Sequence, residues 1–317
     1  RCEAYRSHPL MIRPYADSEV IILRKPKEPG QSRGDLLDYE ETEFTDEMRK
    51  NVRKINAFIA EHYLDLDIFD DQEAELLRLM SHRDEENYLD FTQTRLRRIF
   101  NNASFEQGGR FYGGWWMSVP SDYRSRITID NEPTVELDYS GMHFAIMYAE
   151  KGMDIPMKDP YVLDGYGEDL RDDIKTAFNI IVNCESRGEA IGAINRRIRK
   201  GNGGKLLEAF ADAHPLIKDK IANSEGIRGQ YTESRIAEKV LLKGLEKGMC
   251  ILPMHDGFIT KKKDEDTLMA LMNDAFREVT GRKPRIKHEA FDLSVLPNGS
   301  KKNKERREKA WKEAHGK

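Results

Sequence analysis

The sequence predicts an α+β fold in which helices pack around an antiparallel β-sheet. Two stretches predict strands. Val135 and Leu137 alternate with Glu136 in residues 134–138, and residues 249–260 are typical of two short strands joined by a tight turn. A third stretch predicts a helix, because apolar side chains recur at helical spacing between residues 174 and 182. Strands and helices in this order indicate the α+β class.

The composition is that of a polar chain. It has 317 residues, of which 38% are hydrophobic and 34% charged, and its net charge is −4. No apolar run reaches the length of a membrane span, and nothing resembles a signal peptide. The three cysteines, Cys2, Cys184 and Cys250, are odd in number and widely spaced, which argues against a disulfide framework or a zinc site. We therefore expect a cytoplasmic protein with no membrane partner.

Charge is distributed unevenly along the chain. All charged side chains in residues 35–47 are acidic, whereas arginines gather between residues 95 and 126, and the tail at 299–317 is rich in Lys and Arg. This segregation suits a groove that binds a polyanion, although each run alone is more often a solvated face. The clustered arginines are Arg95, Arg97, Arg98, Arg110, Arg124 and Arg126.

The N-terminal part of the chain predicts one strand followed by helices. The strand covers residues 18–24, and the Pro- and Gly-containing stretch 25–35 is typical of a surface loop. A first helix is expected to start with a cap at Thr45, and two more are expected at residues 73–80 and 92–100. We interpret residues 1–44 as a strand with a linker segment and residues 45–104 as a small helical N-terminal subdomain.

Residues 105–120 combine glycine, arginine and aromatic side chains. Gly108 and Gly109 allow backbone conformations that other residues resist, and Arg110 follows them directly. The neighbouring Trp115 and Trp116 can stack on nucleic-acid bases or can simply pack in the core, and the core is the commoner place for such a pair. Arg110 is the better candidate for contact with phosphate.

Two carboxylates stand at the ends of the predicted central strands. Asp138 ends the first strand, and Asp256 lies in the turn of the hairpin. If the strands are neighbours, the two carboxylates face each other and repel unless a cation lies between them. A divalent metal ion is the usual cation at such a place.

A helix at residues 170–184 presents a polar edge beside its apolar stripe. Arg171, Lys175, Asn179 and Asn183 follow one another at steps of four and therefore share one edge of the helix. Two cations and two amides on one edge can hold a triphosphate, or they can be solvated side chains. Before this helix, another one at residues 141–151 carries His143 in its first turn.

The remaining stretches predict helices and a closing strand. Arg196 and Arg197 lie near a helix end, where they can contact phosphates or complement the helix dipole. Residues 205–248 predict helices that break near Pro215 and again at residues 226–229. A further helix is expected at residues 264–280 and a strand at residues 284–292.

The order of these motifs resembles the series found in family A DNA polymerases and in the related phage-type single-subunit RNA polymerases. Asp-Tyr-Ser at 138–140 resembles motif A of these enzymes, the Arg-x3-Lys helix at 171–175 resembles motif B, and the His-Asp turn at 255–256 resembles motif C. The resemblance implies a polymerase-like palm with reduced helical fingers. The implied parts are a thumb-like segment at 45–104, the palm at 105–158 and 249–298, the fingers-like insertion at 159–248 and a basic tail at 299–317.

The resemblance also implies roles for individual residues. Asp138 and Asp256, with the backbone carbonyl of Tyr139, would hold two Mg²⁺ or Mn²⁺ ions, and Lys175 would protonate the leaving group. The implied partners are a nucleic-acid primer-template and nucleoside triphosphates. Residues expected to contact the nucleotide are Arg171, Lys175, Asn179, His143 and Tyr139. Residues expected to contact nucleic acid are Arg110, Arg124, Arg126, His255, Arg196 and Arg197.

Several departures from the family pattern leave alternatives open. Gly257 and His143 stand where the DNA polymerases carry Glu, and Asn179 and Asn183 stand where motif B carries aromatic residues. We therefore expect a minimal DNA polymerase without a proofreading domain, with an RNA polymerase or primase as an alternative. A palm protein that binds nucleic acid without catalysis is a second alternative. A two-metal nuclease is a third, for which Glu136 is a poor extra ligand.

Overall fold

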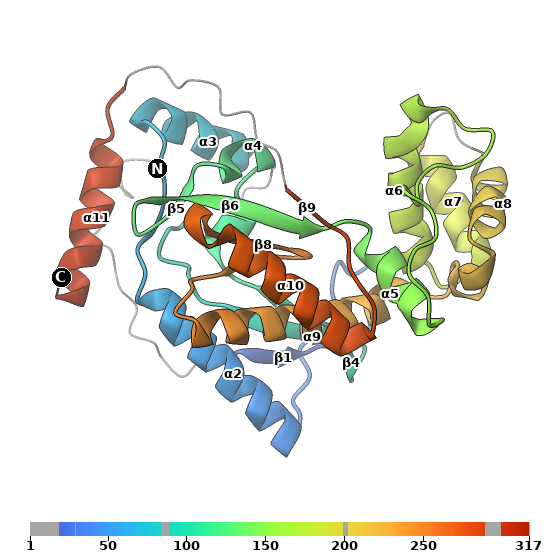
Figure 1. The fold of residues 1–317 in the computed structure, drawn as a ribbon, viewed down its shortest axis with the longest axis horizontal. Coiled ribbons are helices and arrows are strands. Elements are labelled where there is room, and N and C mark those ends of the chain that lie inside the picture. The colour runs from blue at the N-terminus through green and yellow to red at the C-terminus, as the bar shows by residue number, and fades with distance from the viewer. Residues whose placement is uncertain (1–18, 29, 84–88, 199–201, 289–298, 317) are drawn as a thin grey trace.

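The computed structural model describes residues 19–28, 30–83, 89–198, 202–288 and 299–316. It has a mixed α+β fold with two β-sheets and surrounding helices (Figure 1). A lobe of three helices stands apart from the body that contains the sheets. In the described residues, no helix is both long enough and apolar enough to span a membrane.

The larger sheet is organised around its longest strand, β6 (Glu132–Tyr139). The hairpin of β7 (Leu252–Met254) and β8 (Gly257–Lys261) lies along one side of β6, and β9 (Ile286–His288) pairs with the end of β6. Two further strands, β2 (Leu64–Leu66) and β5 (Ile127–Ile129), extend the sheet from the start of β6. All these pairings are antiparallel, so the predicted antiparallel sheet is confirmed.

The smaller sheet contains β1 (Ile21–Leu23), β3 (Arg97–Asn101) and β4 (Ser104–Tyr112). The long helix α9 (Glu225–Glu246) packs against β4 and also contacts α2 (Glu43–Ala60) and α10 (Glu265–Thr280). Helix α10 also contacts β6 and β8, and it buries its apolar stripe, as its spacing predicts. The buried residues of that stripe include Leu268, Leu271, Met272 and Phe276.

Arg98 shows what one of the clustered arginines does. Its side chain is 1% exposed, and the guanidinium donates to the Gly109 carbonyl, to Ser234 Oγ and to Glu238 at 2.8–2.9 Å. Gly109 has a φ of +78°, which suits glycine, and a side chain there would collide with the ring of Phe100. Arg98 therefore ties β3 to α9 and is not available to a polyanion.

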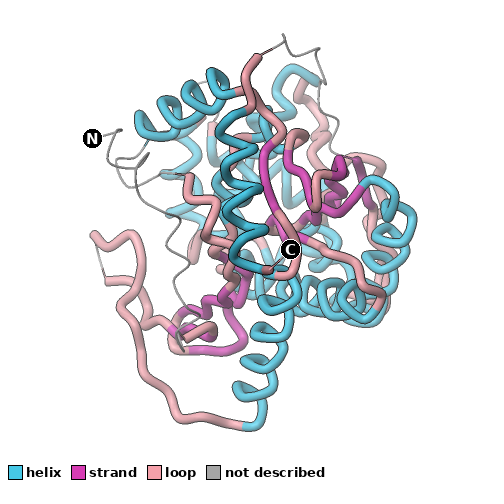
Figure 2. Tube along the Cα trace, turned by 90° about the vertical axis from the view of Figure 1, so that its left-hand side faces the viewer, coloured by secondary structure: helices cyan, strands magenta, loops and turns pink. Residues whose placement is uncertain are grey.

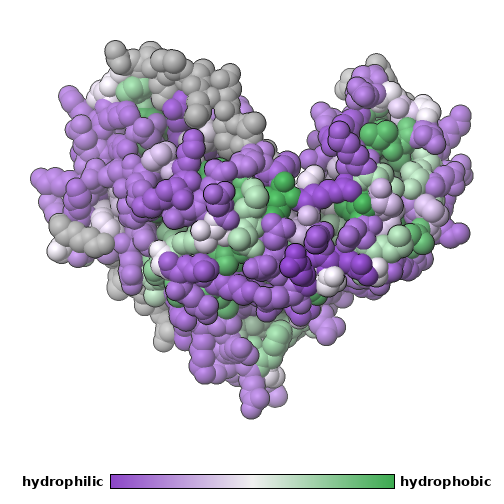
Figure 3. All heavy atoms as spheres, viewed as in Figure 1, coloured by the Kyte–Doolittle hydropathy of each residue, from purple (hydrophilic) through white to green (hydrophobic). Residues whose placement is uncertain are grey.

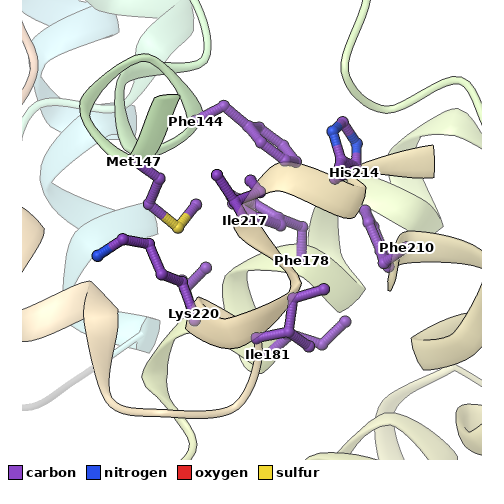
Figure 4. Close-up of a pocket in the computed structure, with 10 residues that line it drawn as sticks. Phe144, Met147, Phe178, Ile181, Phe210, His214, Ile217 and Lys220 are labelled. Carbon is purple, nitrogen blue, oxygen red and sulfur yellow. The ribbon is translucent and has the colours of Figure 1, made fainter. Parts of the chain in front are cut away.

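The three-helix lobe consists of α6 (Arg171–Asn183), α7 (Arg187–Arg197) and α8 (Gly203–Ala213). Helix α5 (Met142–Glu150) leads from β6 into it. In the interior (Figure 4), Phe144 of α5 stacks on Phe178 of α6 with ring centres 3.8 Å apart. The buried ring of His214 lies beside them and bonds the Tyr148 hydroxyl and the Pro160 carbonyl. The lobe and α5 thus share one packed core.

Short helices and turns complete the chain. They are α4 (Ser121–Arg124) and the 3₁₀ helices Trp115–Ser118, Glu168–Leu170, Pro215–Lys220 and Lys262–Asp264. Trp115 and Trp116 are 3% and 0% exposed, and Trp116 donates from its indole nitrogen to the Pro253 carbonyl at 3.0 Å. The pair therefore packs in the core, and stacking on bases is excluded.

Three secondary-structure predictions are wrong. Residues 92–100 do not form a helix, because residues 97–101 form β3 between two partner strands and pairing overrides local propensity. The cap of α2 is Thr42, with Thr45 as the reciprocal member of the capping box. Helix α9 runs unbroken through residues 226–229, where glycine permits close contact and does not end the helix. The predicted strand at 284–292 is confirmed only as β9, since residues 289–292 lie outside the described residues.

The basic tail forms a helix, α11 (Lys302–His315), which docks beside α3 (Asp70–Arg83) on the face turned to the viewer in Figure 2. Arg307 donates to Asp65 at 2.9 Å and to Glu73 at 2.8 Å, and its guanidinium lies 4.1 Å from the ring centre of Phe91. Asp65 is fully buried and also accepts from the Tyr63 hydroxyl. Much of the positive charge of the tail is thus paired within the protein.

We expect Arg307→Met to destabilise the fold by about 3–5 kcal/mol, because it leaves the Asp65 carboxylate buried without its counter-ion. Urea unfolding followed by circular dichroism measures this. Lys309→Met is the control, because Lys309 lies on the same helix with its side chain 78% exposed, and we expect a change within about 0.5 kcal/mol. Equal stability of the two variants would contradict a structural role for Arg307.

Candidate active site

The hairpin of β7 and β8 brings Asp256 beside Asp138. Asp138 lies directly opposite Gly257 in the antiparallel register, and the backbone N–H of Tyr139 donates to the carbonyl of Asp256 at 3.1 Å. The fit at Gly257 is close, because a Cβ there would lie 3.3 Å from Oδ1 of Asp138 and 3.1 Å from the Leu137 carbonyl. The prediction that these two strands are neighbours is confirmed.

Beside the two aspartates lies a buried ion pair. Arg110 of β4 donates from two nitrogens to the two carboxylate oxygens of Glu233 on α9, at 2.7 and 2.6 Å. Glu233 is 2% exposed, and its pKa is raised to about 7 by burial and by the charge of Asp256, which together outweigh Arg110. Arg110, expected to contact nucleic acid, is therefore held in place by a carboxylate of the protein.

Two histidines flank this pair. His143, in the first turn of α5, approaches α9 so closely that a Cβ on Gly229 would lie 2.8 Å from its ring. Among the described residues, its buried Nε2 has no hydrogen-bond partner. Burial and the charge of Arg110 lower the pKa of His143 and of His255, so both rings are neutral at pH 7. A neutral imidazole with a spare nitrogen can accept or donate a hydrogen bond to a ligand.

His255 has a φ of +54°, a left-handed conformation that residues other than glycine rarely adopt. The tight turn between β7 and β8 imposes it, and it places the imidazole next to Tyr112, with ring centres 6.3 Å apart. Strained backbone conformations of this kind are common at sites that bind a ligand.

The polar edge of α6 begins at Arg171, whose partners Asp159 and Tyr161 lie in the loop before the helix. Arg171 donates to Asp159 at 2.6 Å, and its guanidinium lies 5.4 Å from the ring centre of Tyr161. Burial, together with the charge of Asp256, raises the pKa of Tyr161 to about 12. Tyr161 is thus within electrostatic range of both Arg171 and Asp256. Farther along α6, Lys175 and Asn179 are exposed. Figure 3 shows the surface hollowed between the lobe and the body.

Further cations of the protein contact the carboxylates of β6. Nζ of Lys287 lies 3.2 Å from Oδ2 of Asp138. Nε of Arg124 lies 3.2 Å from a carboxylate oxygen of Glu136, which is 6% exposed. Since Glu136 and Asp138 are two residues apart in a strand, both side chains lie on one face of the sheet. The Glu136 carboxylate is therefore paired with Arg124.

Three of the arginines expected to contact nucleic acid lie outside this group of contacts. Arg126 is half-buried, and its carbonyl accepts from the N–H of Asp67 at 2.7 Å. Arg196 and Arg197 are exposed in the last turn of α7, in the lobe. Their position at a helix C-terminus satisfies the helix dipole without any ligand.

Three residues of the site were not predicted from the sequence. Glu233 follows Gly226 and Gly229 at steps of three and four on one face of α9, and small residues at such spacing are the signal that could have marked a close helix contact. Tyr161 follows Asp159 in a loop, and Lys287 lies in a short edge strand. Neither pattern distinguishes a site residue from a surface residue.

The donor set fits Mg²⁺ or Mn²⁺. In the described part of the chain no group of three or more His, Cys, Asp or Glu is placed to hold a metal ion. Mg²⁺ in nucleotide enzymes, however, usually takes one or two carboxylates and completes its shell with water and substrate phosphates. The Tyr139 side chain is buried and its hydroxyl donates to the Met272 carbonyl at 2.7 Å, so only its backbone carbonyl can serve as a ligand.

Comparisons with known proteins show a distant likeness to solved structures. No protein-family model matches the chain, and no curated protein matches it. Among solved structures, the chain is similar to the POL domain of Pol1 from M. smegmatis in complex with DNA primer-template and dNTP, with a TM-score of 0.39 and 11% identity. The match covers 61% of this chain and 47% of that chain. So distant a likeness carries no functional argument.

We expect Glu233→Gln to remove the part of the pH dependence of the unfolding free energy that comes from this carboxyl group. The native carboxyl keeps its proton up to a pKa of about 7, whereas the unfolded chain releases it near 4.5. The native state thus binds more protons in this window, so the free energy of unfolding falls as pH rises from about 4.5 to 7. Urea unfolding at several pH values should show a flatter profile for the variant. Glu246→Gln, at the exposed end of the same helix, is the control and should follow the native profile.

Proposed function

We propose that the protein is a template-directed nucleotidyltransferase, of the DNA polymerase type, that depends on divalent ions. One observation carries the proposal: Asp138 at the end of β6 and Asp256 in the turn before β8 lie side by side. Tyr161 feels the charge of Asp256 and packs under the guanidinium of Arg171, at the start of a cationic helix edge. Paired carboxylates opposite cations suit a reaction in which metal ions and phosphates meet. The sequence motifs at 138–140, 171–175 and 255–256 support the same reaction.

The carboxylates of Asp138 and Asp256 and the backbone carbonyl of Tyr139 would hold two Mg²⁺ or Mn²⁺ ions. Such ions, when bound, lower the pKa of a primer 3′-hydroxyl and offset the charge of the leaving pyrophosphate. The contribution of the protein itself would be to hold these ligands in position. The β6–β8 register holds the two aspartates, and the hydrogen bond from Tyr139 to Asp256 fixes the turn that carries the second one.

The edge of α6 would bind the triphosphate of the incoming nucleotide. Lys175 is exposed and, within the described residues, has no hydrogen bond or ion pair, so its ammonium is free to bind phosphate and to protonate the leaving pyrophosphate. Arg171 would exchange Asp159 for a phosphate oxygen, since phosphate offers a bidentate partner. Asn179 follows one turn later and would contact the nucleotide as well.

The other side of the site would bind the primer-template. Arg110 and His255 lie near Asp256. Arg124 contacts Glu136, which lies two residues before Asp138 on the same face of β6. His143 would contact the sugar of the nucleotide, and because it stands where the DNA polymerases carry Glu, the choice between dNTPs and NTPs stays open. An RNA polymerase or primase is therefore the alternative activity, and a palm that binds nucleic acid without catalysis is the third.

We expect Asp138→Asn to abolish extension of a labelled primer on a DNA template, because the amide lacks the charge that holds a divalent ion. Native protein, Asp138→Asn and Asp266→Asn are compared with Mg²⁺ or Mn²⁺, with dNTPs and NTPs offered separately. Asp266 is an exposed carboxylate on α10, and its variant should retain native activity. Extension with NTPs alone would establish the RNA alternative. Binding of the primer-template without extension would contradict catalysis.

We expect Lys175→Met to lower turnover by about 10²- to 10³-fold, because general acid catalysis contributes 10²- to 10⁴-fold. Single-turnover incorporation of one nucleotide separates this loss from any change in nucleotide affinity. Lys158→Met, an exposed lysine of the loop before α6, is the control. A loss confined to nucleotide affinity would assign Lys175 to binding alone.

A further inference from the structure

Lys287 is a cation to which the proposed reaction assigns no role. Strand β9 pairs antiparallel with the end of β6, and the register sets Lys287 directly across from Asp138. Residues paired across antiparallel strands project to the same face of the sheet. The backbone of β9 thus delivers an ammonium group to one particular carboxylate, at 3.2 Å from its Oδ2.

The two oxygens of Asp138 have different neighbours. Oδ1 lies on the side of Gly257 and Asp256, since a Cβ on Gly257 would approach it to 3.3 Å. Oδ2 lies on the side of β9 and contacts Lys287. Oδ1 is therefore on the side of Asp256, where the two carboxylates could share an ion. Oδ2 is paired with the ammonium of Lys287.

Lys287 also lies near the place proposed for the triphosphate. Its charge acts on Tyr161, whose ring packs under the guanidinium of Arg171. Two residues earlier in the chain, Arg285 donates to the carbonyls of Lys158 and Ile155 at 2.7 and 2.8 Å, which ties β9 to the loop that leads to Tyr161. The Lys287 side chain is 43% exposed, and a lysine on its four-carbon stem can exchange one anionic partner for another.

We propose that Lys287 is an exchangeable counter-ion that opposes binding of a divalent ion at Asp138 until a polyphosphate draws its ammonium away. The inference rests on the proposed function, because it assumes that Asp138 and Asp256 are metal ligands. The role is one of positioning: Lys287 acts on the ion through Asp138 and on the triphosphate through its charge.

The physical argument is one of charge balance. Without metal, Asp138 and Asp256 bring two carboxylates together beside the Arg110–Glu233 pair, and Lys287 supplies a positive charge next to Asp138. A divalent ion that binds Oδ2 must displace that ammonium or lie close to it, and both cost free energy. A triphosphate offers Lys287 new oxygen partners, so loading of metal and nucleotide becomes mutually favourable.

Two binding titrations, in which no nucleotide is incorporated, test this proposal. The first measures Mn²⁺ binding by electron paramagnetic resonance, in the absence of nucleotide. The second measures binding of inorganic tripolyphosphate by calorimetry in EDTA, where no metal is present. The proteins are the native chain, Lys287→Met, Lys287→Gln, Lys287→Arg and the control Lys263→Met. Lys263 is an exposed lysine that pairs with Glu132 at the opposite end of β6.

We expect opposite effects in the two titrations. Lys287→Met and Lys287→Gln should bind Mn²⁺ about tenfold more tightly, because a positive charge beside the site is gone, and tripolyphosphate several-fold more weakly. Lys287→Arg should resemble the native protein in both titrations, and so should Lys263→Met. A merely structural role of Lys287 would weaken both kinds of binding together or change neither.

Other outcomes separate this inference from the proposed function. Native Mn²⁺ binding that is lost in Asp256→Asn but unchanged or weakened in Lys287→Met overturns the role of Lys287 and leaves the metal site standing. Mn²⁺ binding in neither the native protein nor Lys287→Met overturns both. Tighter Mn²⁺ binding with unchanged tripolyphosphate binding overturns the exchange, since the ammonium then has no phosphate partner.

Discussion

The antiparallel pairing of β6 with β8 is the constraint on which the rest of the site depends. It sets Asp138 opposite Gly257, and it lets the Tyr139 N–H donate to the carbonyl of Asp256. A slip of one residue would turn Asp138 to the other face of the sheet, where Leu137 is fully buried. The buried apolar face of this hairpin therefore fixes the position of two partly buried carboxylates.

The same site is built with its own counter-ions. Glu233 is paired with Arg110, Glu136 with Arg124, and Asp138 with Lys287. Gathering acidic groups in a partly buried place is costly unless cations accompany them, so these pairs allow the metal-free protein to keep its shape. The pairs differ in burial. Glu233 and Glu136 are buried and suited to permanent pairing, whereas Asp138 is 17% exposed and Lys287 43% exposed, which suits exchange with a ligand.

A second packed interface relates the carboxylates to the cationic helix edge. Helix α5 follows directly after β6, and its Phe144 stacks on Phe178 of α6. His214 bridges Tyr148 of α5 and the carbonyl of Pro160 beside Tyr161, and burial lowers its pKa so that the ring stays neutral. A movement of α6 relative to the sheet would have to disrupt these contacts. The positions of Arg171 and Lys175 are thus set by apolar packing within the lobe.

What the sequence by itself determined was local. Alternation at residues 134–138, the turn at 255–257 and the stripe at 174–182 predicted the right elements, because each depends on periodicity that neighbouring residues carry. Asp138 and Asp256 could be named for the same reason, since one lies near the end of such a strand and the other in such a turn. The helix expected at residues 92–100 was wrong, because the pairing of β3 with β1 and β4 is decided by chain segments far away in the sequence.

Only the tertiary structure decided which charges meet. Arg110 reaches Glu233 across 123 residues, and Lys287 reaches Asp138 across the register of a three-residue strand. No pattern in the sequence separates Arg98, which is buried against α9, from its exposed neighbour Arg97. The physical reason is that an ion pair needs no periodicity. It forms wherever packing of apolar faces brings opposite charges together, and that packing is a property of the whole chain.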